Sequence, residues 1–197
     1  GITTRSVRAR LLGTHIAHAG ILILLVGHVL TTTLVDRTDP SNFVTLERDV
    51  PTQHQGMELV FTGVEVLSAD EQGYGYRIGD GYVGVVIEAR DVGGSLLGTI
   101  TPGMLRFDSP SGMVSARSEV DRLTGATGDT IVILDLLQSN ELLSSMILGQ
   151  TDDVSEVRVT VHHLQGSHLV WAGWLMVVTG SALASLPRRV TEPSQDE

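Results

Sequence analysis

The sequence predicts a membrane protein of the α+β class, in which two transmembrane helices flank an extracytoplasmic all-β domain, a sandwich or a partly open barrel. Two observations predict it. Apolar residues of the 197-residue chain concentrate in one uncharged stretch near each end, and the middle alternates apolar and polar residues with the period of β-strands. The chain therefore divides into a cytoplasmic segment 1–12, a transmembrane helix 13–35, a β domain 36–167, a transmembrane helix 168–186 and a cytoplasmic tail 187–197.

The first predicted helix, 13–35, contains no Asp, Glu, Lys or Arg. At about 1.5 Å rise per residue it covers the roughly 30 Å of bilayer hydrocarbon. A signal peptide is the alternative, because arginines precede the stretch, but the apolar run is long and lacks a small-x-small cleavage site. The second predicted helix carries small residues suited to close helix packing, namely Gly173, Gly180, Ser181 and Ala184.

Seven segments between the two helices have the composition or alternation of strands, and breaks rich in glycine and aspartate separate them: 42–50, 57–67, 82–89, 95–100, 113–120, 129–137 and 156–164. Short strands at this spacing favour a sandwich or a partly open barrel. The segment 139–150 is predicted to form a short helix.

Charge predicts the orientation of the helices. Arginines flank them on the sides of the chain termini: Arg5, Arg8, Arg10, Arg188 and Arg189. Because positive flanks stay cytoplasmic, both termini are expected inside a cell membrane and the β domain outside. Trp171 and Trp174 suit the outer membrane interface.

Composition excludes several classes of function. The chain has no cysteine, so it forms no disulfide, no thiolate metal site, no thiol nucleophile and no covalent c-type haem link. It has no lysine and a net charge of −10, so it is unsuited to binding nucleic acid, whose phosphates it would repel. The acidity is halophile-like and indicates a salt-loving source, although a genome that favours arginine codons explains the missing lysine about as well.

Three of the seven histidines lie in the first helix: His15, His18 and His28. A histidine inside a bilayer indicates function, although hydrogen bonding to a neighbouring helix or a place among the headgroups is the alternative. The functional interpretation is axial ligation of a b-type haem. The second helix offers only His168, at its mouth, so the other axial histidine would come from outside this chain.

Other chemistry has little support. His162, His163 and His168 could bind a metal, but they lack helical ligand spacing, and adjacent strand residues point to opposite faces. No GxSxG motif occurs, and the glycine-rich segment 73–84 does not open a helix as a phosphate-binding loop does. We therefore assign no catalytic residue and no metal apart from haem iron.

Three segments resemble the C-terminal region of the CcmF family, the haem lyase subunit of system I cytochrome c maturation: RLLGTHIAHAGILILLVG at 10–27, LERDV at 46–50 and VWAGWLMVVTGSALASLPRR at 170–189. The last matches the family's final span at Trp171, Gly173, Met176 and Gly180, and departs from it at Leu169 and Trp174. The likeness covers nearly the whole chain.

The resemblance implies a site and a function. His18, followed by Gly20, falls on the family's transmembrane histidine, an axial ligand of haem b, with His15 as its nearest competitor. The second ligand lies in an earlier helix that this chain lacks. The implied partners are the remaining N-terminal part or subunit of the lyase, apocytochrome c, a haem-delivery chaperone and membrane lipid. The chain alone is not expected to be active.

Two alternatives stay open at this point. One is a non-enzymatic, membrane-anchored β module that serves as a scaffold for another complex. The other is a b-haem subunit of a respiratory electron-transfer complex, because His15 and His28 are spaced roughly as in helices that carry two stacked haems.

Overall fold

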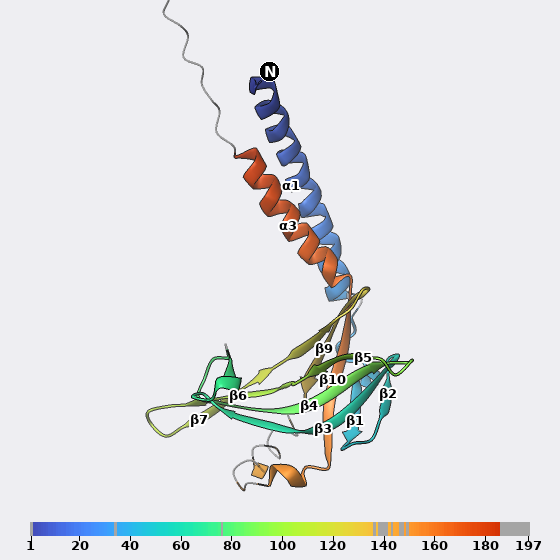
Figure 1. Ribbon diagram of the computed structural model, residues 1–197, viewed down its shortest axis with the longest axis vertical. Coiled ribbons are helices and arrows are strands. Elements are labelled where there is room, and N and C mark those ends of the chain that lie inside the picture. Colours follow the sequence, from blue (N-terminus) through green and yellow to red (C-terminus); the bar gives the residue numbers. More distant parts are fainter. Residues whose placement is uncertain are drawn as a thin grey trace, which may run out of the picture. The chain divides into compact units, whose positions relative to one another are not determined.

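The structure is a computed structural model, which describes residues 2–33, 35–75, 77–135 and 150–185, with single positions between 136 and 149. Contacts divide it into two compact units (Figure 1). One is a helix pair built from both ends of the chain, Gly1–Val35 and Leu164–Glu197, and the other is a β domain, Asp36–His163. The predicted tail 187–197 and most of the predicted helix 139–150 lie outside the described residues.

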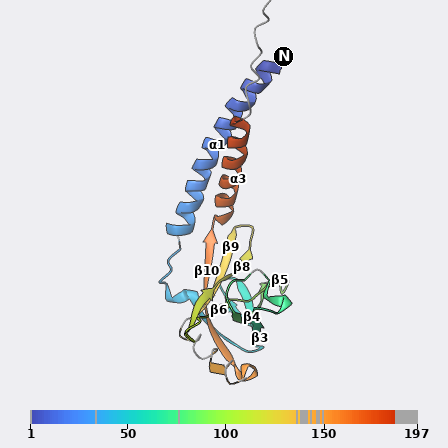
Figure 2. The same ribbon diagram turned by 90° about the vertical axis from the view of Figure 1, so that its left-hand side faces the viewer.

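The helix pair consists of α1 (Ile2–Thr33) and α3 (Ser167–Ala184), which run side by side in opposite directions (Figures 1 and 2). Both helices are long and apolar enough to cross a membrane. Their threonine hydroxyls bond back to the preceding turn, as Thr179 does to the carbonyl of Leu175 at 2.7 Å, which satisfies these hydroxyls without water. Helix α1 begins at Ile2 and so includes most of segment 1–12.

Glycines let the two helices approach closely. Gly13, Gly20 and Gly27 recur every seven residues along the side of α1 that faces α3, where Gly173 and Gly180 stand at the same spacing. A Cβ added at Gly20 would lie 2.8 Å from the Cβ of Met176, and one at Gly173 would lie 2.7 Å from the carbonyl oxygen of Gly20. We call this set of five glycines the glycine seam. It allows backbone-to-backbone packing that larger residues prevent.

The β domain contains two antiparallel sheets. The first has the order β1-β10-β9-β8, built from β1 (Phe43–Glu47), β10 (Glu156–Gln165), β9 (Gly128–Leu134) and β8 (Asp121–Thr124). The second has the order β2-β3-β4-β6-β7, with β5 also paired to β4, built from β2 (Thr52–His54), β3 (Met57–Ser68), β4 (Gly81–Asp91), β5 (Leu96–Ile100), β6 (Gly103–Asp108) and β7 (Val114–Glu119). Three 3₁₀ turns complete it: η1 (Pro40–Asn42), η2 (Gln72–Tyr74) and η3 (Thr151–Asp153).

Alternation along the strands builds the cores. The main core takes side chains from both sheets, among them Leu46, Val159 and Val132 from the first and Phe61, Val85 and Ile87 from the second, all almost fully buried. Tyr82, of opposite parity on β4, instead joins a smaller core with Tyr74 and Leu105. The predicted α+β composition, an all-β domain between two apolar helices, is confirmed. Membrane insertion and orientation stay predictions.

Candidate functional site

His18 lies on the face of α1 that points away from α3. At 3.6 residues per turn, a position two residues from Gly20 is nearly on the opposite side of the helix. The imidazole is accordingly exposed in the helix pair. It shares this face with exposed apolar side chains one to three turns away: Leu11, Leu22, Leu25 and Val29. The face is thus mostly apolar, includes the polar side chains of Thr14, His15 and His18, and is left uncovered by α3.

One hydrogen bond sets the tautomer of His18. Its Nδ1 lies 2.7 Å from the carbonyl oxygen of Thr14, one turn earlier. A carbonyl oxygen only accepts, so Nδ1 carries a proton and donates, and in the neutral imidazole this leaves the lone pair on Nε2. A carbonyl that holds the inner nitrogen while the outer one is free is the usual orienting arrangement for a histidine ligand. The described residues therefore fit one axial position on a haem iron.

The other predicted positions on α1 are arranged differently. His15 and His28 are also exposed, and no hydrogen bond to their rings is found in the part of the chain that the structure describes. Gly20 belongs to the glycine seam, so its backbone approaches α3 on the side away from His18. Its predicted role in letting a haem ring approach stays a prediction, whereas its contact with α3 gives it a packing role.

The remaining histidines do not gather into a metal site. No group of three or more histidine or acidic side chains within the described residues is suited to a metal ion. His163 lies near the hydroxyls of Thr127 (3.3 Å) and Thr130 (3.1 Å). His168 is exposed on α3. His162 is buried, and its Nδ1 has no hydrogen-bond partner among the described residues.

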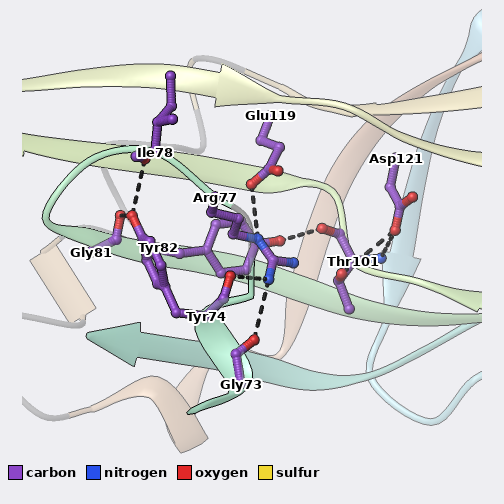
Figure 3. Close-up of polar contacts among 9 residues, drawn as sticks. All are labelled: Gly73, Tyr74, Arg77, Ile78, Gly81, Tyr82, Thr101, Glu119 and Asp121. Carbon is purple, nitrogen blue, oxygen red and sulfur yellow. Dashed lines mark hydrogen bonds and ion pairs between the residues drawn. The ribbon is translucent and has the colours of Figure 1, made fainter. Parts of the chain in front are cut away.

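Sequence reasoning missed a polar cluster in the β domain (Figure 3). Arg77 lies over the ring of Tyr82, with its guanidinium carbon 4.2 Å from the ring centre, and its Nε is 3.0 Å from a carboxylate oxygen of Glu119. The Tyr82 hydroxyl donates to the carbonyl of Thr101, whose own N–H donates to Asp121 at 2.7 Å. Burial raises the pKa of Tyr82 to about 12, so this phenol stays protonated at physiological pH.

The cluster ties η2 to the start of β4 over the smaller core. The Tyr74 hydroxyl donates to the carbonyl of Ile78 at 3.0 Å, and Arg77 Nη1 donates to the carbonyl of Tyr74 at 3.3 Å. Both side chains are thus occupied in closing their own loop, and Glu119 already balances the charge of Arg77. Gly75 and Gly79 have positive φ in the loop between η2 and β4, and the segment leads into a strand. The backbone conformation therefore explains these two glycines without a phosphate.

Together, the fold and the site define a class of chain: a glycine-packed pair of apolar helices, one of which presents an outward histidine, joined to a two-sheet β domain. Neither family models nor curated proteins match the sequence. Among solved structures the chain is similar to the cytochrome c haem lyase CcmF, with a TM-score of 0.59 and 15% identity over 92% of this chain. The match covers 26% of CcmF, so this chain spans about a quarter of that protein. At this identity the similarity shows a shared fold.

Proposed function

We propose that the chain is the C-terminal portion, or a separate subunit, of a membrane complex that attaches haem to apocytochrome c. The observation that carries the proposal is the coincidence of two features. The fold is similar to that of a cytochrome c haem lyase over nearly the whole chain, and His18 presents a free Nε2 on the uncovered face of α1. The complex would form thioether bonds between haem vinyl groups and cysteines of the apoprotein.

Within that complex, His18 would be one axial ligand of a b-type haem. The Thr14 carbonyl would orient the imidazole, the leucines of the same face would keep water from the iron, and the glycine seam would hold α1 rigid against α3. The second ligand would be a histidine of the partner part, because α3 carries only His168, in its first turn. When bound, this haem would supply an electron store that keeps the iron of the substrate haem reduced.

The proposal includes insertion in the cell membrane with both termini in the cytoplasm. Support comes from the two apolar helices and from exposed Trp171 and Trp174 on α3, which suit the interface on the side of the β domain. The other proposed partners are apocytochrome c and a haem-delivery chaperone.

The geometry of α1 counts against a respiratory two-haem helix. His15 and His28 are 13 positions apart in an unbroken helix, and at about 100° per residue they lie on different sides of it. One partner helix therefore cannot offer matching histidines to both.

The test is the reduced-minus-oxidised absorbance spectrum of the complete assembly, with this chain expressed beside the remaining lyase part. His18→Ala should abolish or greatly weaken the b-type haem signal and stop cytochrome c maturation, because the haem iron would lose one of its two axial ligands. His15→Ala, one turn away, and His54→Ala, in the β domain, are the controls and should leave both near normal. Loss of the signal in His15→Ala with an intact spectrum in His18→Ala would contradict the assignment.

A further inference from the structure

Strand β7 has a free edge. It pairs with β6, and among the described residues no other strand pairs with it. Ser109 N–H donates to the carbonyl of Met113 at 2.8 Å, and hydrogen-bonded pairs alternate along an antiparallel ladder. Ser115 and Arg117 therefore bond to β6, whereas the N–H and C=O groups of Val114 and Ala116 point away from it.

The charged side chains of β7, Arg117 and Glu119, lie at positions whose backbone bonds to β6, and not at the positions whose backbone faces the free edge. Natural edge strands are usually blocked by lysine, proline or an inward-pointing charge. Here the three positions whose backbone groups face outward carry the uncharged residues Val114, Ala116 and Ser118. Val114 and Ala116 are exposed, and so is Met113 just before them. A free, exposed edge of this kind is the template to which an extended peptide adds as a further strand.

A pocket of about 270 Å³ lies beside this edge. Two rows of cross-strand neighbours run across the sheet at this point. One row is Val66, Val83, Met104 and Ser118, and the next is Gly81, Arg106 and Ala116. Cross-strand partners share a face of the sheet. The floor of the pocket is therefore formed by apolar side chains, those of Val66, Val83 and Met104, together with the guanidinium of Arg106. An added strand would place the residue opposite Ala116 on the same face, with its side chain at the pocket.

The charges around the pocket favour a cationic segment. The Arg106 Nη2 is 2.6 Å from a carboxylate oxygen of Asp108, and Asp80 also lines the pocket, so two carboxylates stand against one guanidinium. The Arg106 Nε is buried and has no hydrogen-bond partner among the described residues. The net charge of these three groups is −1, which a lysine or arginine would balance and an acidic side chain would increase.

We propose that β7 and this pocket bind an extended segment of an unfolded polypeptide by strand addition, with an apolar side chain in the pocket and a lysine or arginine beside it. The inference rests on the proposed function, because a chain that is to receive haem is held unfolded and extended. The segment exchanges hydrogen bonds with the backbone of Val114 and Ala116.

The test measures binding of a fluorescein-labelled peptide to the full-length chain in detergent micelles, by fluorescence anisotropy under reducing conditions. The peptide contains a Cys-x-x-Cys-His segment and a lysine on each side of it. Ala116→Pro removes the outward N–H, while the β6–β7 ladder, which does not use that group, is kept. The matched control, Ala116→Thr, keeps the N–H. We expect Ala116→Pro to weaken binding about tenfold or more and Ala116→Thr to leave it nearly unchanged.

Two modified peptides make the result independent of any folding defect in the variant. A peptide N-methylated at alternate amides cannot pair with an edge and should lose binding to the unchanged chain. A peptide with glutamates in place of the lysines should bind about tenfold more weakly. Equal binding of the N-methylated peptide, equal binding of the glutamate peptide, or no binding of the original peptide up to about 1 mM would each overturn the inference. The peptide-binding assay does not depend on the haem spectrum. If the peptide fails to bind, the proposed function is not contradicted, and if His18 proves not to be a haem ligand, the peptide-binding result is not affected.

Discussion

The orientation of the His18 ring depends more on its position on α1 than on the residues next to it in sequence. Any helical histidine can bond the carbonyl one turn earlier, so the bond to Thr14 was not predictable from sequence. The sequence identified His18 by its depth in an apolar stretch. Its outward direction follows from the glycine seam, which turns the other face of α1 toward α3. The packing role of Gly20 was missed because the contact that it makes is with a residue far along the chain.

Two histidines of the β domain, the partly buried His54 and the buried His162, predict a loss of stability in mild acid. Burial lowers the pKa of His54, and burial together with the charge of Arg37 lowers the pKa of His162. In the unfolded chain both keep a pKa near 6.5, so below that pH the unfolded state binds more protons. Stability is therefore full above about pH 6.5 and falls as the pH drops below it.

Replacement of both by glutamine should flatten this pH dependence. Urea unfolding of the full chain in micelles, followed at about pH 8 and about pH 5, should show a smaller drop in midpoint for His54→Gln/His162→Gln than for the native chain. His168→Gln, at an exposed position on α3, is the control. If the urea midpoint fell equally in the double variant and the native chain, the acid sensitivity would not come from these two histidines.

The glycine seam predicts that size, rather than polarity, governs the pairing of α1 with α3. A side chain at Gly173 would begin 2.5 Å from the backbone nitrogen of Leu24, which cannot move aside. Gly173→Leu should therefore force the helices apart and destabilise the pair by about 1–3 kcal/mol. Unfolding in mixed micelles can be followed by the fluorescence of Trp171 and Trp174. Ala182→Leu adds similar bulk on an exposed side of α3 and should have little effect; equal destabilisation by both would argue against the seam.

Composition and alternation located seven of the ten strands that the described residues form. Alternation is clearest in β10, where Val157, Val159 and Val161 are buried and the residues between them are less so. The strand β6 was missed since both of its faces are covered, so Met104 and Leu105 are buried together and no alternation remains. The short strands β2 and β8, three and four residues long, carry too little pattern to be recognised. The Arg77–Tyr82–Glu119 cluster joins a loop to two strands, so no local signal could have predicted it.

The whole chain combines an arginine-flanked helix pair with an acidic β domain: residues 36–163 hold 20 of the 23 acidic residues and 8 of the 13 arginines. Its predicted topology places both termini in the cytoplasm. Protease added to intact spheroplasts should cleave the loop 74–80 of the β domain and spare the tail 191–197. Antibodies to each segment detect the cleavage. Cleavage of the tail in sealed spheroplasts would contradict the predicted orientation. A salt-loving source stays an interpretation of the acidity.

The central claim is that the imidazole of His18 itself ligates a haem shared with a partner chain, and chemical rescue tests it most directly. His18→Gly in the complete assembly removes the ligand and leaves a space of its size, so free imidazole can take its place at the iron. We expect the reduced-minus-oxidised signal of the b-type haem to disappear in this variant and to return as imidazole is added, with His15→Gly unchanged throughout. A full haem signal in His18→Gly without imidazole would contradict the account.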